Sequence, residues 1–344
     1  MFPVPVGLMV AGMSLSAVSP AFSPVLSPAL SIVAPCFDEE AVLPEFLQRM
    51  GAVLDALPDG MGADSEILVV DDGSRDGTWA VLSEAAARDR RIVAVRLMRN
   101  HGHQLALTAG LSLCRGQRIL VIDADLQDPP ELLPDMMRLM DGVNGEGGAD
   151  VVYGQRRLRE GETLFKRASA SIFYRMIGRL TDVPIPTDAG DFRLMTRRVV
   201  DVLSAMPERH RFIRGMVAWI GGKQVPILYD RKARAAGESK YPLRMMVAFA
   251  ADAITAFSVV PLMAALIIGW VMALVGLAFF LYSIVGWMLD YNLPGWTSLM
   301  AAMGLLGGAQ FLMLGIIGAY LGRLYDQSKG RPLFMIREIL GGPK

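Results

Sequence analysis

Short apolar runs alternate with amphipathic segments along the first part of the chain. The stretches "LSIVAPC", "EILVV", "RIVAVRLM" and "RILVI" are apolar and rich in β-branched residues, which is typical of buried strands. Between them, "AVLPEFLQRMGAVLDAL", "WAVLSEAAARD" and "QLALTAGLSLC" have the pattern of helices. Strands that alternate with helices in this way predict βαβ units and a mostly parallel sheet.

A long stretch toward the C-terminus has almost no charge. No charged residue occurs between positions 253 and 289, and only one occurs between 290 and 322. Two apolar segments within it, 259–282 and 296–320, each reach the ~20 residues that cross a hydrocarbon core as a helix. The alternative is a buried hairpin of a soluble protein, and aromatic residues near the segment ends argue against it: Trp287, Tyr291 and Trp296.

Basic residues lie on one side of the predicted pair of transmembrane helices, and the loop that connects the helices has none. Those before the first helix and after the second are Arg231, Lys232, Arg234, Lys240, Arg244, Arg323, Lys329, Arg331 and Arg337. By the positive-inside rule, both ends of the chain are expected in the cytoplasm.

Charge and cysteine content change this picture little. Lys and Arg together number 34, as do Asp and Glu, so the net charge of zero argues neither for nor against a nucleic-acid partner. Cys36 and Cys114 lie far apart and beside apolar segments, and we expect two buried free thiols in a reducing compartment.

The apolar N-terminal residues contain no Lys or Arg, so the charged part of a secretory signal is missing, and they are interpreted as a flexible extension. The predicted organisation is therefore an extension at 1–29, an α/β domain at 30–228, a basic loop with an amphipathic juxtamembrane helix at 229–258, transmembrane helices at 259–282 and 296–320, and a cytoplasmic tail at 321–344.

Acidic residues follow three of the predicted strands. They are Asp38, Glu39 and Glu40, then Asp71 and Asp72, then Asp123 and Asp125. Ligands of open α/β sheets bind at the carboxyl ends of the strands, where these acids should meet. No GxGxxG or GxxxxGK[ST] motif follows any of the strands, so a glycine-rich phosphate loop is not expected. A carboxylate pair on a strand end can instead bind Mg²⁺ or Mn²⁺, which would bridge the oxygens of a diphosphate.

Seven motifs occur in an order that resembles a known family: "SIVAPCFDEE", "VVDDGSRDGT", "RNHGHQLALTAG", "VIDADLQDPPE", "YGQRR", "DAGDFRLM" and "FIRGMVAWIGG". Together with two following spans, they are similar to family 2 glycosyltransferases of the polyprenyl-phosphate type, such as dolichol-phosphate mannose synthases and bacterial undecaprenyl-phosphate glucosyltransferases. The resemblance implies a Rossmann-like GT-A catalytic domain. It also implies inverting transfer of a sugar from a nucleotide-sugar to the phosphate of a long lipid.

The same resemblance assigns the donor site. Asp71 and Asp72 would contact base and ribose, with a capped turn as the alternative reading. Asp125 would be the main ligand of Mg²⁺ or Mn²⁺, with Asp123 supporting it and Gln127 close to the diphosphate. Pro35 and Glu39 match the first strand end of the family, although Phe37 and Asp38 stand where a tyrosine and an asparagine are usual.

The motif "DAGDFRLM" supplies Asp188, Asp191 and Arg193, and the resemblance places Asp191 beside the acceptor as the presumed base. The acceptor is a phosphate whose second pKa is about 6, so it is already largely ionised at neutral pH. We therefore expect Asp191 mostly to position the acceptor or the metal, with Asp125 and Arg193 as the other catalytic residues.

Basic residues are expected to bind the diphosphate or the lipid phosphate, because arginine forks and lysine charges suit phosphate. Arg156, Lys166 and Arg167 are the candidates after "YGQRR", with plain surface solvation as the alternative. Arg234, Ser239 and Lys240 match a basic loop of the family ahead of the first span. His101 and His103 are expected to cap a helix or contact the nucleotide rather than to bind metal.

The resulting hypothesis is glucose transfer from UDP-glucose to undecaprenyl phosphate by a multi-pass protein of a bacterial inner membrane, with the catalytic domain in the cytoplasm. The expected partners are the donor, the polyprenyl phosphate, the bilayer and further copies of the chain, a tetramer by analogy; no nucleic acid is expected. The alternatives are another sugar (mannose, an N-acetylhexosamine or amino-arabinose), a soluble acceptor, or a non-catalytic scaffold that binds nucleotide-sugar.

Overall fold

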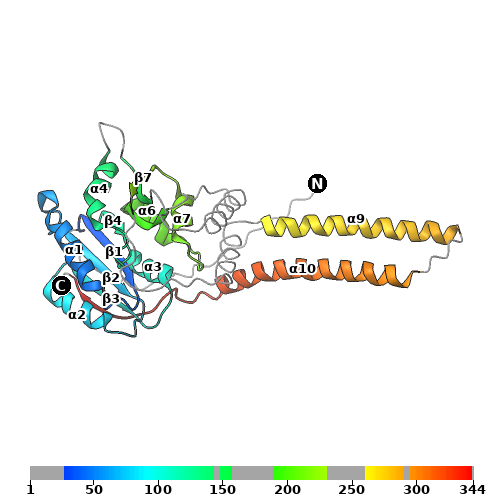
Figure 1. Cartoon of the computed structure of the whole chain (residues 1–344), viewed down its shortest axis with the longest axis horizontal. Coiled ribbons are helices and arrows are strands. Elements are labelled where there is room, and N and C mark those ends of the chain that lie inside the picture. Colours follow the sequence, from blue (N-terminus) through cyan, green and yellow to red (C-terminus); the bar gives the residue numbers. More distant parts are fainter. Residues whose placement is uncertain (1–26, 143–147, 157–188, 231–259, 290–294, 343–344) are drawn as a thin grey trace, which may run out of the picture.

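The computed structural model describes residues 27–142, 148–156, 189–230, 260–289 and 295–342. Figure 1 shows an α/β domain from which two long helices, α9 (Val260–Met288) and α10 (Trp296–Ser328), extend side by side. Most of the predicted N-terminal extension and nearly all of the predicted juxtamembrane loop and helix lie outside the described residues.

The domain contains an eight-stranded sheet in the order β7-β5-β6-β4-β1-β2-β3-β8. Its strands are β1 (Leu30–Cys36), β2 (Ser65–Asp71), β3 (Ile92–Leu97), β4 (Arg118–Val121), β5 (Val151–Arg156), β6 (Ala189–Thr196), β7 (Gln224–Tyr229) and β8 (Ile336–Gly341). β1 pairs in parallel with β2 and β4, β2 with β3, and β5 with β7. Three pairs are antiparallel: β4 with β6, β5 with β6, and β3 with β8. The predicted α/β class with a mostly parallel sheet is confirmed.

Helices cover both faces of the sheet, which explains why the central strands are apolar at nearly every position. Successive side chains of β1 point to opposite faces, so Ile32 and Ala34 pack in one core and Val33 in the other. The helices of the first face are α1 (Leu43–Asp55), α2 (Thr78–Arg88) and α4 (Leu133–Asp141), and those of the second are α3 (His103–Leu113), α6 (Arg197–Ala205) and α7 (Ile213–Ile220). Short 3₁₀ turns lie at Pro58–Gly60 and Pro130–Leu132.

Helix α3 lies unusually close to the sheet. A Cβ atom added to Gly110 would come 2.3 Å from Val33 Cγ1 and 3.2 Å from Val70 Cγ2. Only glycine permits this approach, and it fixes the height of α3 above β1 and β2. The first residues of α3 are thereby held beside the carboxyl ends of these strands.

The chain returns to the domain after α10. Strand β8 pairs antiparallel with β3, and Phe334 and Ile336 pack against the core that contains Val95 and Leu97. Residues 321–344, which the sequence pattern predicts only as a tail, thus contain a strand of the sheet. Both ends of the α9–α10 hairpin are therefore connected to the same sheet, at β7 and at β8.

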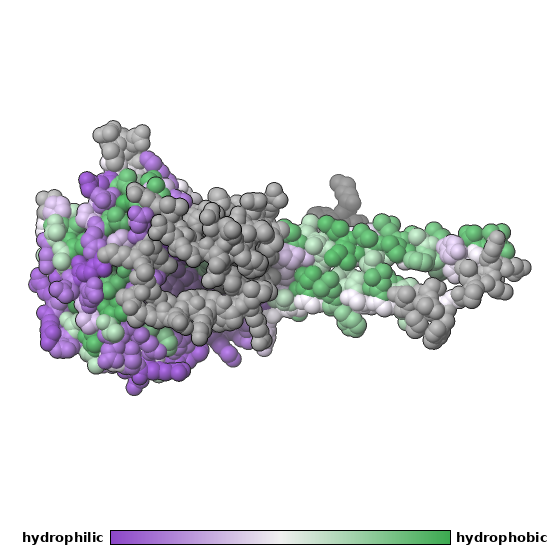
Figure 2. Space-filling view, viewed as in Figure 1, coloured by the Kyte–Doolittle hydropathy of each residue, from purple (hydrophilic) through white to green (hydrophobic). Residues whose placement is uncertain are grey.

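The described part of the chain has two helices that are long and apolar enough to cross a membrane. They are Val260–Gly286 and Ala302–Ser328, with mean hydropathies of 2.5 and 1.7 and with 6% and 0% of their most apolar windows buried. Figure 2 shows hydrophobic surface along most of both helices and a largely hydrophilic surface on much of the domain. Water would solvate this apolar surface poorly, whereas the hydrocarbon core of a bilayer would match it.

We expect Gly110→Ala to destabilise the domain by about 1–3 kcal/mol, since the new methyl group must push α3 away from β1. The measurement is thermal unfolding of the detergent-solubilised protein followed by intrinsic fluorescence. Gly51→Ala in α1 is the matched control, because its Cβ would meet nothing closer than Arg91 Nη2 at 3.8 Å. An equal unfolding midpoint in both variants would contradict the close packing of α3.

Candidate functional site

A cavity of about 370 Å³ opens at the carboxyl ends of β1, β2 and β4, next to the start of α3. Its lining includes Pro35, Phe37, Glu39, Asp72, Asn100, Gly102, His103, Asp123 and Asp125. The predicted meeting of the acidic strand ends at one edge is thus found in the structure. Their location agrees with the usual ligand edge of an open α/β sheet.

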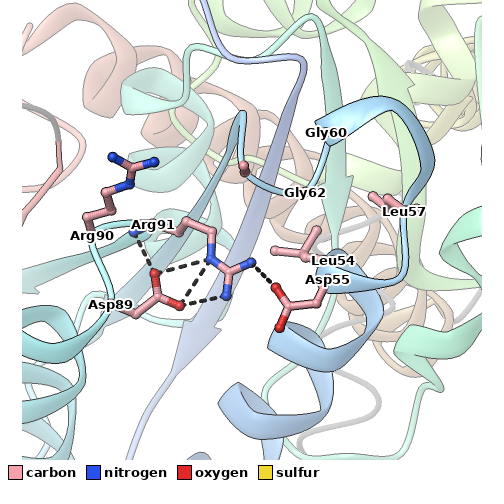
Figure 3. A pocket seen from close by; sticks show the side chains of 9 residues that line it. Leu54, Asp55, Leu57, Gly60, Gly62, Asp89, Arg90 and Arg91 are labelled. Carbon is pink, nitrogen blue, oxygen red and sulfur yellow. Dashed lines mark hydrogen bonds and ion pairs between the residues drawn. The ribbon is translucent and has the colours of Figure 1, made fainter.

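A second cavity, of about 310 Å³, lies at the opposite edge, where β2 and β3 begin. Figure 3 shows Arg91 there between Asp89 and Asp55, with Arg91 Nη2 2.8 Å from Asp89 Oδ2 and Nη1 2.6 Å from Asp55 Oδ1. The Arg91 guanidinium is engaged by both carboxylates, and the other basic residue of the lining, Arg90, is exposed at the surface. The carboxyl edge is the candidate site.

Asp123 and Asp125 come shortly after the end of β4 at Val121. The Oδ1 atom of Asp123 is buried and has no hydrogen-bond partner within the described residues. Asp125 Oδ1 accepts a hydrogen bond from Gln127 N at 3.1 Å, and Leu126 between them has a left-handed φ of 59°. Such strain in a non-glycine residue tends to persist where a site requires a particular turn. Burial, with the nearby charge of Asp191, raises the pKa of Asp123 to about 6 against the opposing effect of His103.

The carboxylates of Asp123 and Asp125 suit a divalent ion whose other ligands are not protein side chains. No group of three or more His, Cys, Asp or Glu side chains suited to a metal occurs in the described ranges. Mg²⁺ is commonly held by one or two carboxylates plus substrate phosphates and water, so a complete protein cage is not required. The unpartnered buried oxygen of Asp123 is the kind of atom that such an ion would satisfy.

Asp191 lies near the start of β6 and is held by residues of α3. Gln104 Nε2 donates a hydrogen bond to Asp191 Oδ2 at 2.9 Å, and His103 Nε2 lies 3.2 Å from the same oxygen. Arg193 and Arg214 approach Oδ1 with their Nη2 atoms at 3.9 Å and 3.7 Å. Burial opposes ionisation, yet His103 and the two arginines hold the pKa of Asp191 well below its usual range. The carboxylate is therefore charged at neutral pH.

His103 and Gln104 connect elements that are distant in the sequence. Gln104 Oε1 accepts a hydrogen bond from Ile213 N at 2.9 Å, so one amide joins α3 to both β6 and α7. His103 Nε2 also lies 3.6 Å from Asp123 Oδ1 and so stands between Asp123 and Asp191. Although burial opposes its charge, the hydrogen bond with Asp191 and the charge of Asp123 raise the pKa of His103 to about 9.

The sequence predicts for His103 only a capping or nucleotide role, and Gln104 and Arg214 are not among the predicted site residues. Their signal was present in the motifs, since "HGHQ" follows a strand whose carboxyl end belongs to the ligand edge, and Arg214 lies in "FIRG". What the sequence could not supply is the pairing of these residues with Asp191.

Asp71 and Asp72 have clear structural partners. Asp71 is fully buried; its Oδ1 accepts from Ser74 N at 2.8 Å, and Arg96 Nε lies 3.4 Å from Oδ2. Asp72 accepts from His101 N at 2.7 Å and from Gly102 N at 2.8 Å, and burial raises its pKa. Asp71 thus holds the turn that precedes α2, whereas Asp72 holds the turn before α3 and also lines the cavity.

The other predicted residues fall into two groups. Pro35 and Gln127 are buried beside the cavity and Glu39 lies at its edge, whereas Arg156 is at the end of β5. Six predicted residues lie outside the described part of the chain. They are Asp188 and the phosphate-binding candidates Lys166, Arg167, Arg234, Ser239 and Lys240.

The chain is similar to proteins of one known family. Residues 31–203 match the model of the family described as Glycosyl transferase family 2. An uncharacterized glycosyltransferase, YkcC of Bacillus subtilis (strain 168), is 42% identical over 315 residues, which cover 90% of this chain and 94% of the relative.

Two further proteins are similar. The prophage bactoprenol glucosyl transferase homolog of Escherichia coli (strain K12) is 34% identical and covers 90% of this chain and 99% of its own length. The solved structure of the mannosyltransferase PcManGT from Pyrobaculum calidifontis, in complex with GDP-Man and Mn²⁺, aligns with 88% of this chain and 89% of that chain at 15% identity and a TM-score of 0.42. On the strength of the family match and of the curated relatives, the chain belongs to glycosyltransferase family 2 and is a glycosyltransferase.

Proposed function

We propose that the protein transfers a sugar from a nucleotide-sugar to a polyprenyl phosphate at the cytoplasmic face of a bacterial inner membrane. Glucose from UDP-glucose and undecaprenyl phosphate are the preferred substrates. One observation carries the proposal: Asp123 and Asp125 line a cavity beside the Asp191 cluster, to which His103 connects them, and the same domain carries two apolar helices. The likeness to a bactoprenol glucosyl transferase homolog over 90% of the chain supports the lipid acceptor.

The donor would bind along the cavity. Asp125 and Asp123 would hold Mg²⁺ or Mn²⁺, which when bound neutralises the charge of the leaving diphosphate. Pro35, Glu39 and Asp72 line the part of the cavity formed by β1 and β2, where a nucleoside would lie, and Gln127 is placed beside the metal ligands.

The role of Asp191 follows from its ionisation. A carboxylate whose pKa lies well below its usual range is a weak base, and an ionised phosphate acceptor needs no base at neutral pH. Asp191 therefore orients the groups around it, including His103 and Arg214, rather than taking a proton. Inversion follows if the acceptor oxygen attacks the sugar from the face opposite the diphosphate.

The function is tested with membranes from cells that express the full chain, incubated with radiolabelled nucleotide-sugars and extracted with organic solvent. Label is expected in the lipid phase only when a divalent metal is present. A soluble acceptor would leave labelled product in the water phase, and a scaffold would give no product at all. A panel of UDP- and GDP-sugars identifies the donor.

Asp125→Asn should lower the transfer of label by about a hundredfold or more, because charge stabilisation of the leaving diphosphate depends on the ion that it holds. Asp201→Asn on α6 is the matched control, since this carboxylate is 64% exposed and lies outside the site. Equal loss in both variants would show that the assay reports folding rather than the metal site.

Metal affinity should depend on pH through Asp123. Its pKa of about 6 means that the carboxylate is ionised at neutral pH and protonated below pH 6. Because a proton and the metal compete for the same oxygens, the affinity for Mn²⁺ should fall by up to about tenfold per pH unit below pH ~6 and change little above pH ~7. Calorimetric titration of the metal-free protein measures this, and Asp123→Asn should remove the dependence. A wild-type affinity that stays constant down to pH ~5 contradicts the assignment.

Gln104→Leu should reduce turnover about tenfold or more and leave the KM for the donor nearly unchanged. Leucine removes the donor to Asp191 and the acceptor for Ile213 N, and a buried hydrogen bond to a charged group contributes about 1.5–3 kcal/mol. Steady-state kinetics of the purified protein checks this, with Ser112→Ala on the exposed side of the same helix as the control. Unchanged turnover would mean that Asp191 keeps its position without the amide.

A further inference from the structure

Buried polar atoms without partners gather around Asp191. Within the described residues, Asp191 Oδ1, Arg193 Nε and Arg214 Nε are all buried and make no hydrogen bond. Buried polar atoms in native proteins nearly always have a partner, so the two Nε–H groups indicate an acceptor that the described residues do not supply. The distances agree, because the two Nη2 atoms stop 3.9 Å and 3.7 Å from Asp191 Oδ1, too far for hydrogen bonds.

The cluster has an excess of positive charge. Arg193 is only 3% exposed, and both Arg193 and Arg214 face one carboxylate, that of Asp191, while His103 is shared between Asp191 and Asp123. Arg156 lies on the other side of the same strand start: a Cβ atom on Gly190 would be 3.4 Å from Arg156 Nη2, and the Arg156 Nε is also buried without a partner. Guanidinium groups in such surroundings are stable only when anions match them, and two convergent forks suit the oxygens of a phosphate.

The position of Arg214 shows from which side this anion would come. α7, which carries Arg214, begins after a loop that is tied to α10: Gln327 Nε2 donates to Pro207 O at 2.7 Å, and Arg209 N donates to Gln327 Oε1 at 3.2 Å. Gln327 belongs to the last turn of the apolar helix. In Figure 1, α7 lies on the side of the domain from which α9 and α10 project. α7, which carries Arg214, therefore lies on the side of the domain from which the apolar helices project, whereas Asp123 and Asp125 line the cavity at the carboxyl edge of the sheet.

We propose that Arg214, together with Arg193, binds the monophosphate of the membrane-borne prenyl acceptor beside Asp191. The inference rests on the proposed function, because it divides that reaction between a donor subsite at Asp123 and Asp125 and an acceptor subsite at the arginines. The forks hold the phosphate oxygen next to Asp191 and satisfy the buried Nε atoms. The prenyl chain leads back along the loop Pro207–Phe212 toward α10.

The test compares Arg214→Gln with the wild-type full chain in detergent. The probes are a short-chain prenyl monophosphate and the prenyl alcohol of the same length, with binding measured by calorimetry, and the KM values of donor and acceptor are measured separately. Loss of charge-assisted hydrogen bonds should weaken binding of the monophosphate about tenfold or more. The affinity for the alcohol and the KM for the donor should change by less than about twofold. Arg214→Lys keeps the charge but loses the planar guanidinium, so its affinity for the monophosphate should lie between those of the wild type and Arg214→Gln. Arg198→Gln on the exposed face of α6 is the matched control and should behave as wild type.

Several outcomes would overturn the inference. It is wrong if Arg214→Gln and wild type bind the monophosphate equally, if the wild type binds monophosphate and alcohol alike, or if the donor KM rises instead of the acceptor KM. If Arg214→Gln proves unfolded by thermal melting, Arg214→Lys decides by the same criteria.

The two proposals fail separately. If label enters the lipid phase and the Arg214 variant binds the monophosphate as the wild type does, the proposed function is supported and the arginine subsite is wrong. If monophosphate binding depends on Arg214 but no nucleotide-sugar gives a lipid product, the arginine subsite is supported and the proposed function is wrong.

Discussion

The site depends on keeping one carboxylate, Asp191, ionised in surroundings that are almost closed to water. Burial alone would favour its neutral form, and the hydrogen bond with His103 together with the charges of Arg214, Arg193 and His103 reverses that preference. These groups come from three elements, α3, β6 and α7, and each needs Asp191 in the same place. The position of the two helices against the sheet is thus coupled to the charge of a single side chain.

Asp123 and Asp191 show that similar carboxyl groups in one site can be tuned in opposite directions. Asp123 has a buried oxygen with no hydrogen-bond donor, so burial dominates and its pKa rises to about 6. Asp191 has donors and cations, so its pKa falls. His103 lies between them and lowers the pKa of both. A divalent ion at Asp123 would replace the missing donor and stabilise its ionised form, whereas Asp191 is ionised already.

The sequence predicted those features that depend on neighbouring residues and on the geometry of parallel strands. Apolar runs separated by helices predicted the central sheet, and the rule that parallel strands end at one edge brought together Asp72, Asp123 and Asp125. The contacts of Asp191 escaped prediction because His103 and Gln104 lie 88 and 87 residues away, and Ile213 lies 109 residues from Gln104. Strand β8 escaped for the same reason: its partner β3 precedes both apolar helices.

The return of the chain after α10 gives the two apolar helices a structural role beyond the proposed membrane attachment. A domain connected to a bilayer by one flexible segment could present any face to the lipid, and a phosphate at the membrane surface would reach Asp191 only in some orientations. Here β8 joins the far edge of the sheet and Gln327 holds the loop before α7, so the exit from α10 is fixed to the domain at two places. Each contact alone is a few hydrogen bonds, but two anchors on different elements restrict rotation in a way that one cannot. The side of the domain that carries Arg214 is thereby kept toward the helices, which is the orientation that the proposed transfer to a lipid phosphate requires.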